Sequence, residues 1–102
     1  MRAMVLHAPG QALRMEERPD PHPAADEVRL RVLACAVCRT DLHVVDGDLP
    51  LPRLPIVPGH EIVGIVDRLG AEVGSLRLGQ RVGVPWLAHT CGHCAYCRLG
   101  CE

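Results

Sequence analysis

Aromatic residues are almost absent from this chain of 102 residues, which contains one tryptophan, one tyrosine and no phenylalanine. Proteins that bind single-stranded nucleic acids stack bases on aromatic side chains, and this chain has few to offer. The formal net charge is -1, with acidic and basic residues interspersed, so there is no basic stripe to neutralise phosphates. The composition therefore argues against nucleic-acid binding and requires a core of Val, Leu, Ile and Ala.

Long apolar segments are absent as well. No run approaches the length needed to cross a bilayer, and the apolar segment of a secretion signal does not follow Met1 and Arg2. We therefore expect a cytoplasmic protein that binds no membrane and folds as one small domain over residues 1–102. Without a secretion signal, six cysteines at tight spacings favour a metal site over a disulfide framework.

The alternation of apolar and polar residues predicts a mainly β fold. A short helix is predicted over residues 40–46, with Thr40 as its N-cap and Gly47 at its end. Several short strands separated by closely spaced turns imply a barrel or sandwich with one or two minor helices. The expected strands cover residues 2–7, 12–16, 27–37, 62–69 and 80–85.

A C-x2-C-x2-C motif at residues 91–97 is the densest chemical signal. Thiols at this spacing are typical of structural zinc sites, which take four ligands in a tetrahedral shell. We expect residues 89–102 to form a zinc lobe around Cys91, Cys94 and Cys97. Either Cys101 supplies the fourth ligand, or the chain is a piece of a longer protein; a partner chain could also donate a thiol.

Two further segments contain zinc-ligand residue types. Cys38 follows the apolar strand, and His60 and Glu61 follow a proline-rich loop. Together they supply a thiolate, an imidazole and a carboxylate, and catalytic zinc sites use three protein ligands plus an open position. Each alone has a simpler explanation, a buried core cysteine or a surface His–Glu pair. Their occurrence together with the cysteine motif favours a catalytic metal site.

Three stretches of the chain strongly resemble the N-terminal, GroES-like part of zinc-dependent medium-chain alcohol dehydrogenases. They are residues 34–43 (ACAVCRTDLH), residues 58–61 (PGHE) with the glycines at 64, 70, 74 and 79, and the cysteines at 91, 94 and 97. The resemblance covers essentially the whole chain. It implies a GroES-like, partly open barrel, and a parent reaction in which an alcohol and NAD or NADP give an aldehyde or ketone.

The resemblance also implies metal ligands. Cys38 and His60 resemble two ligands of the catalytic zinc, and Glu61 resembles the acidic neighbour that binds the ion transiently or tunes it. Asp41 resembles the acid that orients His60. Cys91, Cys94 and Cys97 resemble three of the family's four structural zinc ligands. Cys101 could substitute for the fourth ligand.

Other residues resemble the family's proton relay and cofactor contacts. Thr40 resembles the hydroxyl that takes the proton from the alcohol, and His43 the outer end of that relay, since histidine titrates near neutral pH. Arg39 resembles a contact to the cofactor pyrophosphate. Leu49 and the segment around Trp86 are candidates to line the substrate pocket, although packing of Trp86 is the simpler expectation.

The chain lacks the strand, glycine-rich turn and helix of a nucleotide-binding domain. The resemblance implies that this domain, the third catalytic zinc ligand and the fourth structural cysteine fall beyond residue 102. We therefore expect a truncated domain that is inactive alone and whose structural zinc site fills more readily than the catalytic one. We also expect self-association through the exposed interdomain face.

Two other functional classes compete with this interpretation. A small zinc-binding interaction module would pair Cys35 and Cys38 with Cys91 and Cys94, but their separation far exceeds the zinc-ribbon gap of roughly 15–20 residues. A GroES-like scaffold would leave the cysteine motif and His60 unexplained. A thiol redox role for the Cys35-x2-Cys38 pair is a minor alternative, because no βαβ pattern surrounds it.

Overall fold

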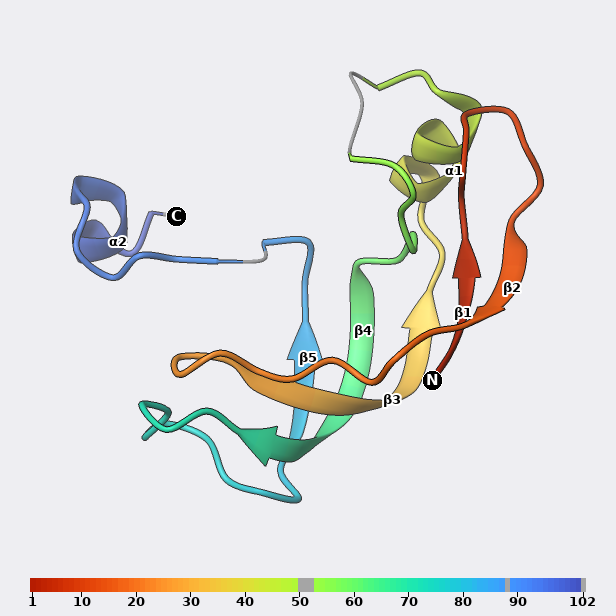
Figure 1. Ribbon diagram of the computed structural model, residues 1–102. Coiled ribbons are helices and arrows are strands. Elements are labelled where there is room, and N and C mark those ends of the chain that lie inside the picture. Colours follow the sequence, from red (N-terminus) through yellow and green to blue (C-terminus); the bar gives the residue numbers. More distant parts are fainter. Residues whose placement is uncertain (50–52, 88, 102) are drawn as a thin grey trace.

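The computed structural model describes residues 1–49, 53–87 and 89–101. It confirms a mainly β fold, and the five expected strands appear with ends shifted by no more than two residues. The elements are β1 (Arg2–Val5), β2 (Arg14–Glu17), β3 (Val28–Ala36), α1 (Arg39–Asp46), β4 (Glu61–Leu69), β5 (Arg81–Val84) and α2 (Ala95–Leu99) (Figure 1).

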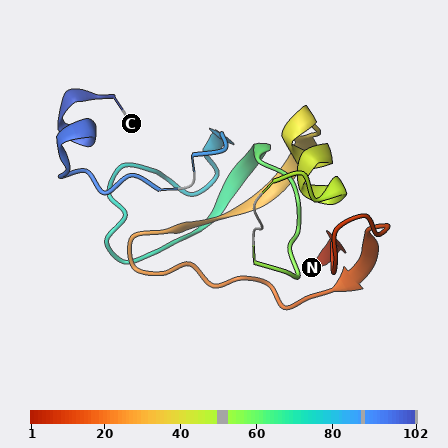
Figure 2. The same cartoon turned by 90° about the horizontal axis from the view of Figure 1, so that it is seen from above.

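The strands form two antiparallel sheets that stay open. One sheet pairs β1 with β2, and the other has the order β3-β4-β5. The turn after β1 reaches α1, where the Gly10 N–H donates to the Val45 carbonyl over 2.7 Å. Figures 1 and 2 both show α1 and the two-stranded sheet at the same end of the molecule.

Buried aliphatic side chains lie in both sheets, in and just after β1 and in β4. Val5 and Leu6 are fully buried, Val66 of β4 is almost fully buried, and Ala3 also has little exposed surface. Leu6 and Ile56 exchange two backbone hydrogen bonds of 2.8 and 3.0 Å, which form an isolated bridge. The bridge ties the loop that precedes β4 to the core, and so holds the approach to His60 in place.

The register of β3 on β4 determines which residues meet at the end of the sheet. Cys35 pairs with Ile62 and Ala36 with Glu61. Cys38 comes just after this paired end and His60 just before it, so antiparallel pairing brings them together although they are 22 positions apart in the chain.

The predicted helix cap was wrong by two residues: α1 begins at Arg39, and its N-cap is Cys38 rather than Thr40. Cys38 has an extended backbone, and its sulfur accepts the Thr40 N–H over 3.2 Å. The Asp41 carboxylate reciprocates by accepting the Cys38 N–H, so a thiol occupies the place of the usual hydroxyl in a capping box. Gly47 ends the helix as predicted, with a left-handed φ of 86°.

A cysteine-rich lobe follows β5 and contains α2. In both views this lobe lies apart from the two sheets (Figures 1 and 2). Cys94 is the N-cap of α2, and its sulfur accepts the Cys97 N–H. Among the described residues, neither helix has the length and apolar character needed to span a bilayer.

Candidate metal centres and substrate cavity

Cys38 and His60 form the centre of the first candidate site. Their Sγ and Nε2 atoms are 3.0 Å apart, and both side chains are partly buried. On the other side of the ring, His60 Nδ1 lies 3.1 Å from Asp41 Oδ1. The imidazole is therefore held between a thiol and a carboxylate, with Nε2 directed toward the sulfur.

Asp41 orients both partners of this pair. Its side chain is 7% exposed, and among the residues that the structure describes it is the one charged residue that is buried. Its Oδ2 accepts the Cys38 N–H over 2.9 Å, while its Oδ1 faces His60. Although its oxygens also lie within 4.8 Å of the sulfur and the imidazole nitrogen, both are already engaged. Asp41 therefore acts as the carboxylate that orients the histidine, an arrangement common around zinc-binding imidazoles.

The donor atoms of Cys38 and His60 are of the types that suit zinc. For tetrahedral zinc with usual bond lengths, a sulfur and a nitrogen ligand stand about 3.6 Å apart. The observed 3.0 Å is shorter, so the pair would open by about half an ångström to share an ion. The residues therefore fit two corners of a zinc site, and Glu61 beside them offers an oxygen.

The two groups shift each other's proton affinity. The pKa of the Cys38 thiol is held below its usual value despite partial desolvation. The largest cause is the hydrogen bond from the Thr40 side chain, and the N–H groups of Thr40 and Asp41 and the His60 ring add to it. Desolvation lowers the pKa of His60, but contact with Cys38 and the charges of Asp41 and Glu61 outweigh it and raise that pKa. Both shifts favour a thiolate beside an imidazolium.

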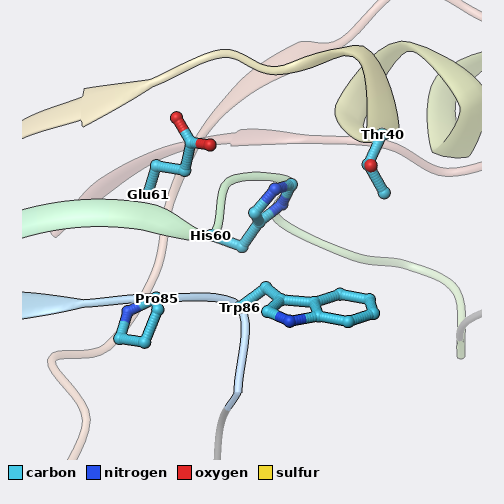
Figure 3. A pocket seen from close by; sticks show the side chains of 5 residues that line it. All are labelled: Thr40, His60, Glu61, Pro85 and Trp86. Carbon is cyan, nitrogen blue, oxygen red and sulfur yellow. The ribbon is translucent and has the colours of Figure 1, made fainter.

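A cavity of about 310 Å³ opens beside the Cys38–His60 pair. Figure 3 shows Thr40 from the first turn of α1, His60 and Trp86 facing this space. The lining residues are Thr40, His60, Glu61, Pro85 and Trp86. Such a volume is near the lower end of the range for small-molecule sites.

The expectation that Trp86 is packed in the core was wrong. Its side chain is 76% exposed and lies along the cavity, and Pro85 lies there too. Pairing of Ile62 with Val84 in β4 and β5 aligns the residues that follow β5 with those that precede β4. No local sequence signal marked Pro85 as part of the site, because its place depends on this long-range pairing.

Three other predicted site residues are not among those that line the cavity. His43, on the same helix as Thr40, has its Nδ1 2.8 Å from Asp48 Oδ2. Arg39 is exposed at the first position of α1, and Leu49 is also exposed. The Asp48 partner of His43 was not recognised in the sequence, where it is one of several acidic residues in a polar stretch.

The second candidate site is the three-thiol cluster, formed by Cys91, Cys94 and Cys97. Cys97 Sγ lies 3.8 Å from Cys91 Sγ and 3.5 Å from Cys94 Sγ, and all three sulfurs fall within 4.8 Å of one another. Two thiolates on tetrahedral zinc stand about 3.8 Å apart. The two separations from Cys97 are close to this value, so the three thiols suit three corners of a zinc site.

Backbone donors stabilise negative charge in the three-thiol cluster. N–H groups of His93 and Cys94 lower the pKa of the Cys91 thiol to about 7, with smaller contributions from the Cys94 and Cys97 side chains. Cys101 Sγ instead donates to the Leu99 carbonyl over 3.5 Å and is not among the converging thiols. Glu102, the last residue of the predicted zinc lobe, lies outside the described residues.

Comparison with known proteins identifies relatives of the whole chain. A family model described as the alcohol dehydrogenase GroES-like domain matches residues 24–102. An alcohol dehydrogenase of Geobacillus stearothermophilus is 46% identical over 100% of this chain and 31% of its own length. The chain thus spans about a third of that relative.

Solved structures agree with this match. A thermostable alcohol dehydrogenase from Pyrobaculum aerophilum, described as cobalt- and zinc-bound, superposes with a TM-score of 0.89 at 34% identity, over 99% of this chain and 31% of its own. An NAD-dependent alcohol dehydrogenase gives a TM-score of 0.89 at 33% identity, over 100% of this chain and 30% of its own.

Proposed function

Because the chain belongs to the family of alcohol dehydrogenase GroES-like domains, we propose that it forms the zinc-holding and alcohol-binding part of an alcohol dehydrogenase. The observation that supports this most directly is the Cys38–His60 pair, which Asp41 orients at the edge of a cavity. The overall reaction converts an alcohol and NAD or NADP into an aldehyde or ketone and the reduced nucleotide.

Cys38 and His60 would hold the catalytic zinc ion, with Glu61 as a third, weaker donor. A bound zinc ion supplies Lewis acidity, which lowers the pKa of a hydroxyl group that it contacts. Asp41, whose Oδ1 faces His60 Nδ1, would keep a proton on Nδ1 and leave Nε2 free to bind the ion. Trp86 and Pro85 form an apolar wall that would contact the hydrocarbon part of the alcohol.

Thr40 is the proposed first acceptor of the alcohol proton, since its side chain lines the cavity. His43 lies three residues further along α1, and residues at this spacing are neighbours on a helix surface. Its Nδ1 contacts Asp48 Oδ2, and the residue is partly exposed, so His43 is placed to pass the proton to solvent. A bound nicotinamide would accept the hydride from the alcohol carbon, and these side chains would carry the proton toward solvent.

The nicotinamide nucleotide would be bound mainly by a part of the enzyme outside these 102 residues. The sequence has no glycine-rich nucleotide-binding fingerprint. Arg39, exposed at the start of α1, is proposed to contact the pyrophosphate of the nucleotide. We accordingly propose that the 102-residue chain alone produces no reduced nucleotide from an alcohol.

The three-thiol cluster would hold the structural zinc ion, with Cys101 or a thiol from outside the chain as the fourth ligand. Three soft donors already stand at the right separations. The catalytic site has two firm donors, so the structural site is proposed to fill first.

Exposed apolar side chains also support self-association. Val32 of β3 is 56% exposed, and Val37, which follows β3, is 76% exposed. Light scattering should show dimers or larger species that grow with concentration. A monomer over the whole concentration range would contradict this part of the proposal.

The test of the proposed function uses zinc content and the single tryptophan. Elemental analysis should find about two zinc ions per chain at saturation, and Cys38→Ser should reduce this to about one. Cys35→Ser is the matched control, since Cys35 lies close in the chain but its thiol donates to the carbonyl of Ala36 rather than facing His60. It should leave the content unchanged.

Alcohol binding would be followed by Trp86 fluorescence. Trp86 is the one tryptophan of the chain and lines the cavity, so its emission reports on that site alone. Adding a primary alcohol to the zinc-loaded chain should change the emission, and Cys38→Ser should abolish the change. An unchanged zinc content in Cys38→Ser, or equal fluorescence responses of both proteins, would refute the proposal.

A further inference from the structure

The residue that follows the end of α1 places a carboxylate against the imidazole of His43. Asp48 Oδ2 lies 2.8 Å from His43 Nδ1, and both side chains reach solvent. An ionised carboxylate can only accept a hydrogen bond. In the neutral ring the contact therefore requires the proton on Nδ1, and it leaves Nε2 as the nitrogen that can take up a further proton.

The backbone at the end of α1 fixes the place of Asp48. Gly47 has the left-handed conformation of a C-cap, and this turns the chain back along the helix. The N–H groups of Gly47 and of Asp48 both donate to the His43 carbonyl, each over 3.0 Å. Asp48 is therefore joined to His43 twice, once through its own N–H and once through its carboxylate.

The turn after β1 holds this C-cap from the other side. A Cβ at Gly47 would lie 2.7 Å from the Cβ of Pro9, so the two backbones approach closely. The Gly10 N–H also donates to the Val45 carbonyl over 2.7 Å. An isolated surface ion pair holds no fixed geometry, whereas here the carboxylate stands beside the ring on a supported turn.

We propose that Asp48 is a positioning residue for proton transfer, which fixes His43 in the tautomer with the proton on Nδ1 and a lone pair on Nε2. The inference rests on the proposed function, in which Thr40 lines the cavity and His43 follows it in the relay. Asp48 is not among the residues that line the cavity, so it acts through His43.

The proton transfer that this tautomer permits is balanced. Thr40 gives its hydroxyl proton to His43 Nε2 as it accepts the proton of the alcohol, so Thr40 does not itself ionise. The imidazole ring then gives one proton to water and returns to its starting charge. An unrestrained neutral imidazole carries its proton mainly on Nε2, and without Asp48 most rings would have no lone pair there.

The first experiment determines the tautomer of His43 in the metal-free 102-residue chain. Nitrogen-15 NMR at roughly pH 9, where ordinary histidines with a pKa of about 6.5 are neutral, distinguishes the ring nitrogen that carries the proton. The resonances that His43→Gln removes identify this ring among the six histidines. The proton should be found on Nδ1, and a proton on Nε2 in the unaltered chain would overturn the proposal.

Two variants show whether the carboxylate of Asp48 is the cause. Asp48→Ala keeps the backbone N–H that completes the helix cap, so it removes the side-chain contact alone, and the proton should move to Nε2. Asp46→Ala is the matched control, since it removes an exposed carboxylate from the last position of α1 and should leave the tautomer unchanged. An unchanged tautomer in Asp48→Ala would overturn the proposal.

The second experiment follows proton release from the zinc-loaded chain by stopped flow. Mixing with a primary alcohol should change the Trp86 emission and release a proton to an indicator dye. Asp48→Ala should slow the proton release at least about tenfold, with the zinc content and the Trp86 change as in the unaltered chain. An unaltered chain without the Trp86 change would refute the proposed function. A normal Trp86 change with equal release rates in both proteins would refute the role of Asp48 alone.

Discussion

Replacing Asp41 by asparagine should damage the candidate catalytic site without removing either proposed metal ligand. The carboxylate accepts two N–H groups, from the Cys38 backbone over 2.9 Å and from His60 Nδ1 at 3.1 Å. An asparagine side chain offers one acceptor oxygen and one NH2 donor. If the oxygen stays on the Cys38 N–H, the NH2 group faces His60 Nδ1 and forces the ring proton onto Nε2. The nitrogen directed at the ion then has no free lone pair.

The magnitude follows from these contacts. Removal of the orienting partner of a metal-binding histidine costs about 10- to 100-fold in metal affinity. Loss of a charge-assisted hydrogen bond at a buried carboxylate lowers the free energy of unfolding by roughly 1.5–3 kcal/mol. For a domain of this size the melting temperature should fall by at least about 6 °C.

The assay is competition for zinc with a chromophoric chelator at neutral pH, in a Cys91→Ser background that removes the structural site. The melting temperature is followed in parallel by circular dichroism. Asp46→Asn is the matched control, since Asp46 is an exposed residue at the other end of α1. The reasoning is refuted if Asp41→Asn binds zinc within about twofold of the unaltered protein, or if Asp46→Asn weakens binding equally.

Three further predictions concern other parts of the chain. Gly59 has a φ of 124°, and a Cβ there would lie 2.7 Å from Cys35 Sγ. Gly59→Ala should therefore lower the free energy of unfolding, measured by urea titration, by roughly 1–3 kcal/mol. An unchanged urea midpoint would show that the loop around Gly59 adjusts freely. In the metal-free chain, Cys91 should be the lobe thiol most reactive with iodoacetamide at pH 7, since its pKa is lowered to about 7. The alkylation rate of Cys91 should fall as the pH drops below 7, and saturating zinc should suppress the reaction. Equal rates for all lobe thiols would contradict the lowered pKa of Cys91. The hydrogen bond from His7 lowers the pKa of Glu16 below its ordinary value of 4.5. The contact therefore stabilises the fold above pH 4.5, and this contribution is lost as the pH falls through the lowered pKa of Glu16. His7→Ala should flatten the pH dependence of the melting temperature in that range, and an unchanged profile would exclude the contact as its cause.

The three-thiol cluster shows how much a short motif can predict. All three cysteines fall within seven residues, and one turn leading into α2 is enough to make their sulfurs converge. The position of each strand was similarly predictable, because the alternation of side chains is a local property of the chain. The same local analysis failed at the start of α1, where Cys38 takes a capping role that hydroxyl and carboxamide side chains usually fill.

The Cys38–His60 site depends on contacts that no short window of sequence contains. The two residues meet because β3 pairs with β4 in one particular register. A shift of one residue would turn every side chain of the strand to the opposite face. The double role of Asp41 follows from the same arrangement, since its carboxylate reaches His60 only when the end of β3 and the start of β4 are neighbours.

The sequence by itself determined the kinds of ligand, the strand pattern and the three-thiol cluster, because each depends on residues that are close in the chain. Only the tertiary structure determined that Trp86 and Pro85 line the cavity and that His43 pairs with Asp48 outside its lining. It also directed Cys101 away from the other thiols. The physical reason is that strand register and loop closure bring together residues far apart in sequence, and composition or spacing contains no record of that geometry.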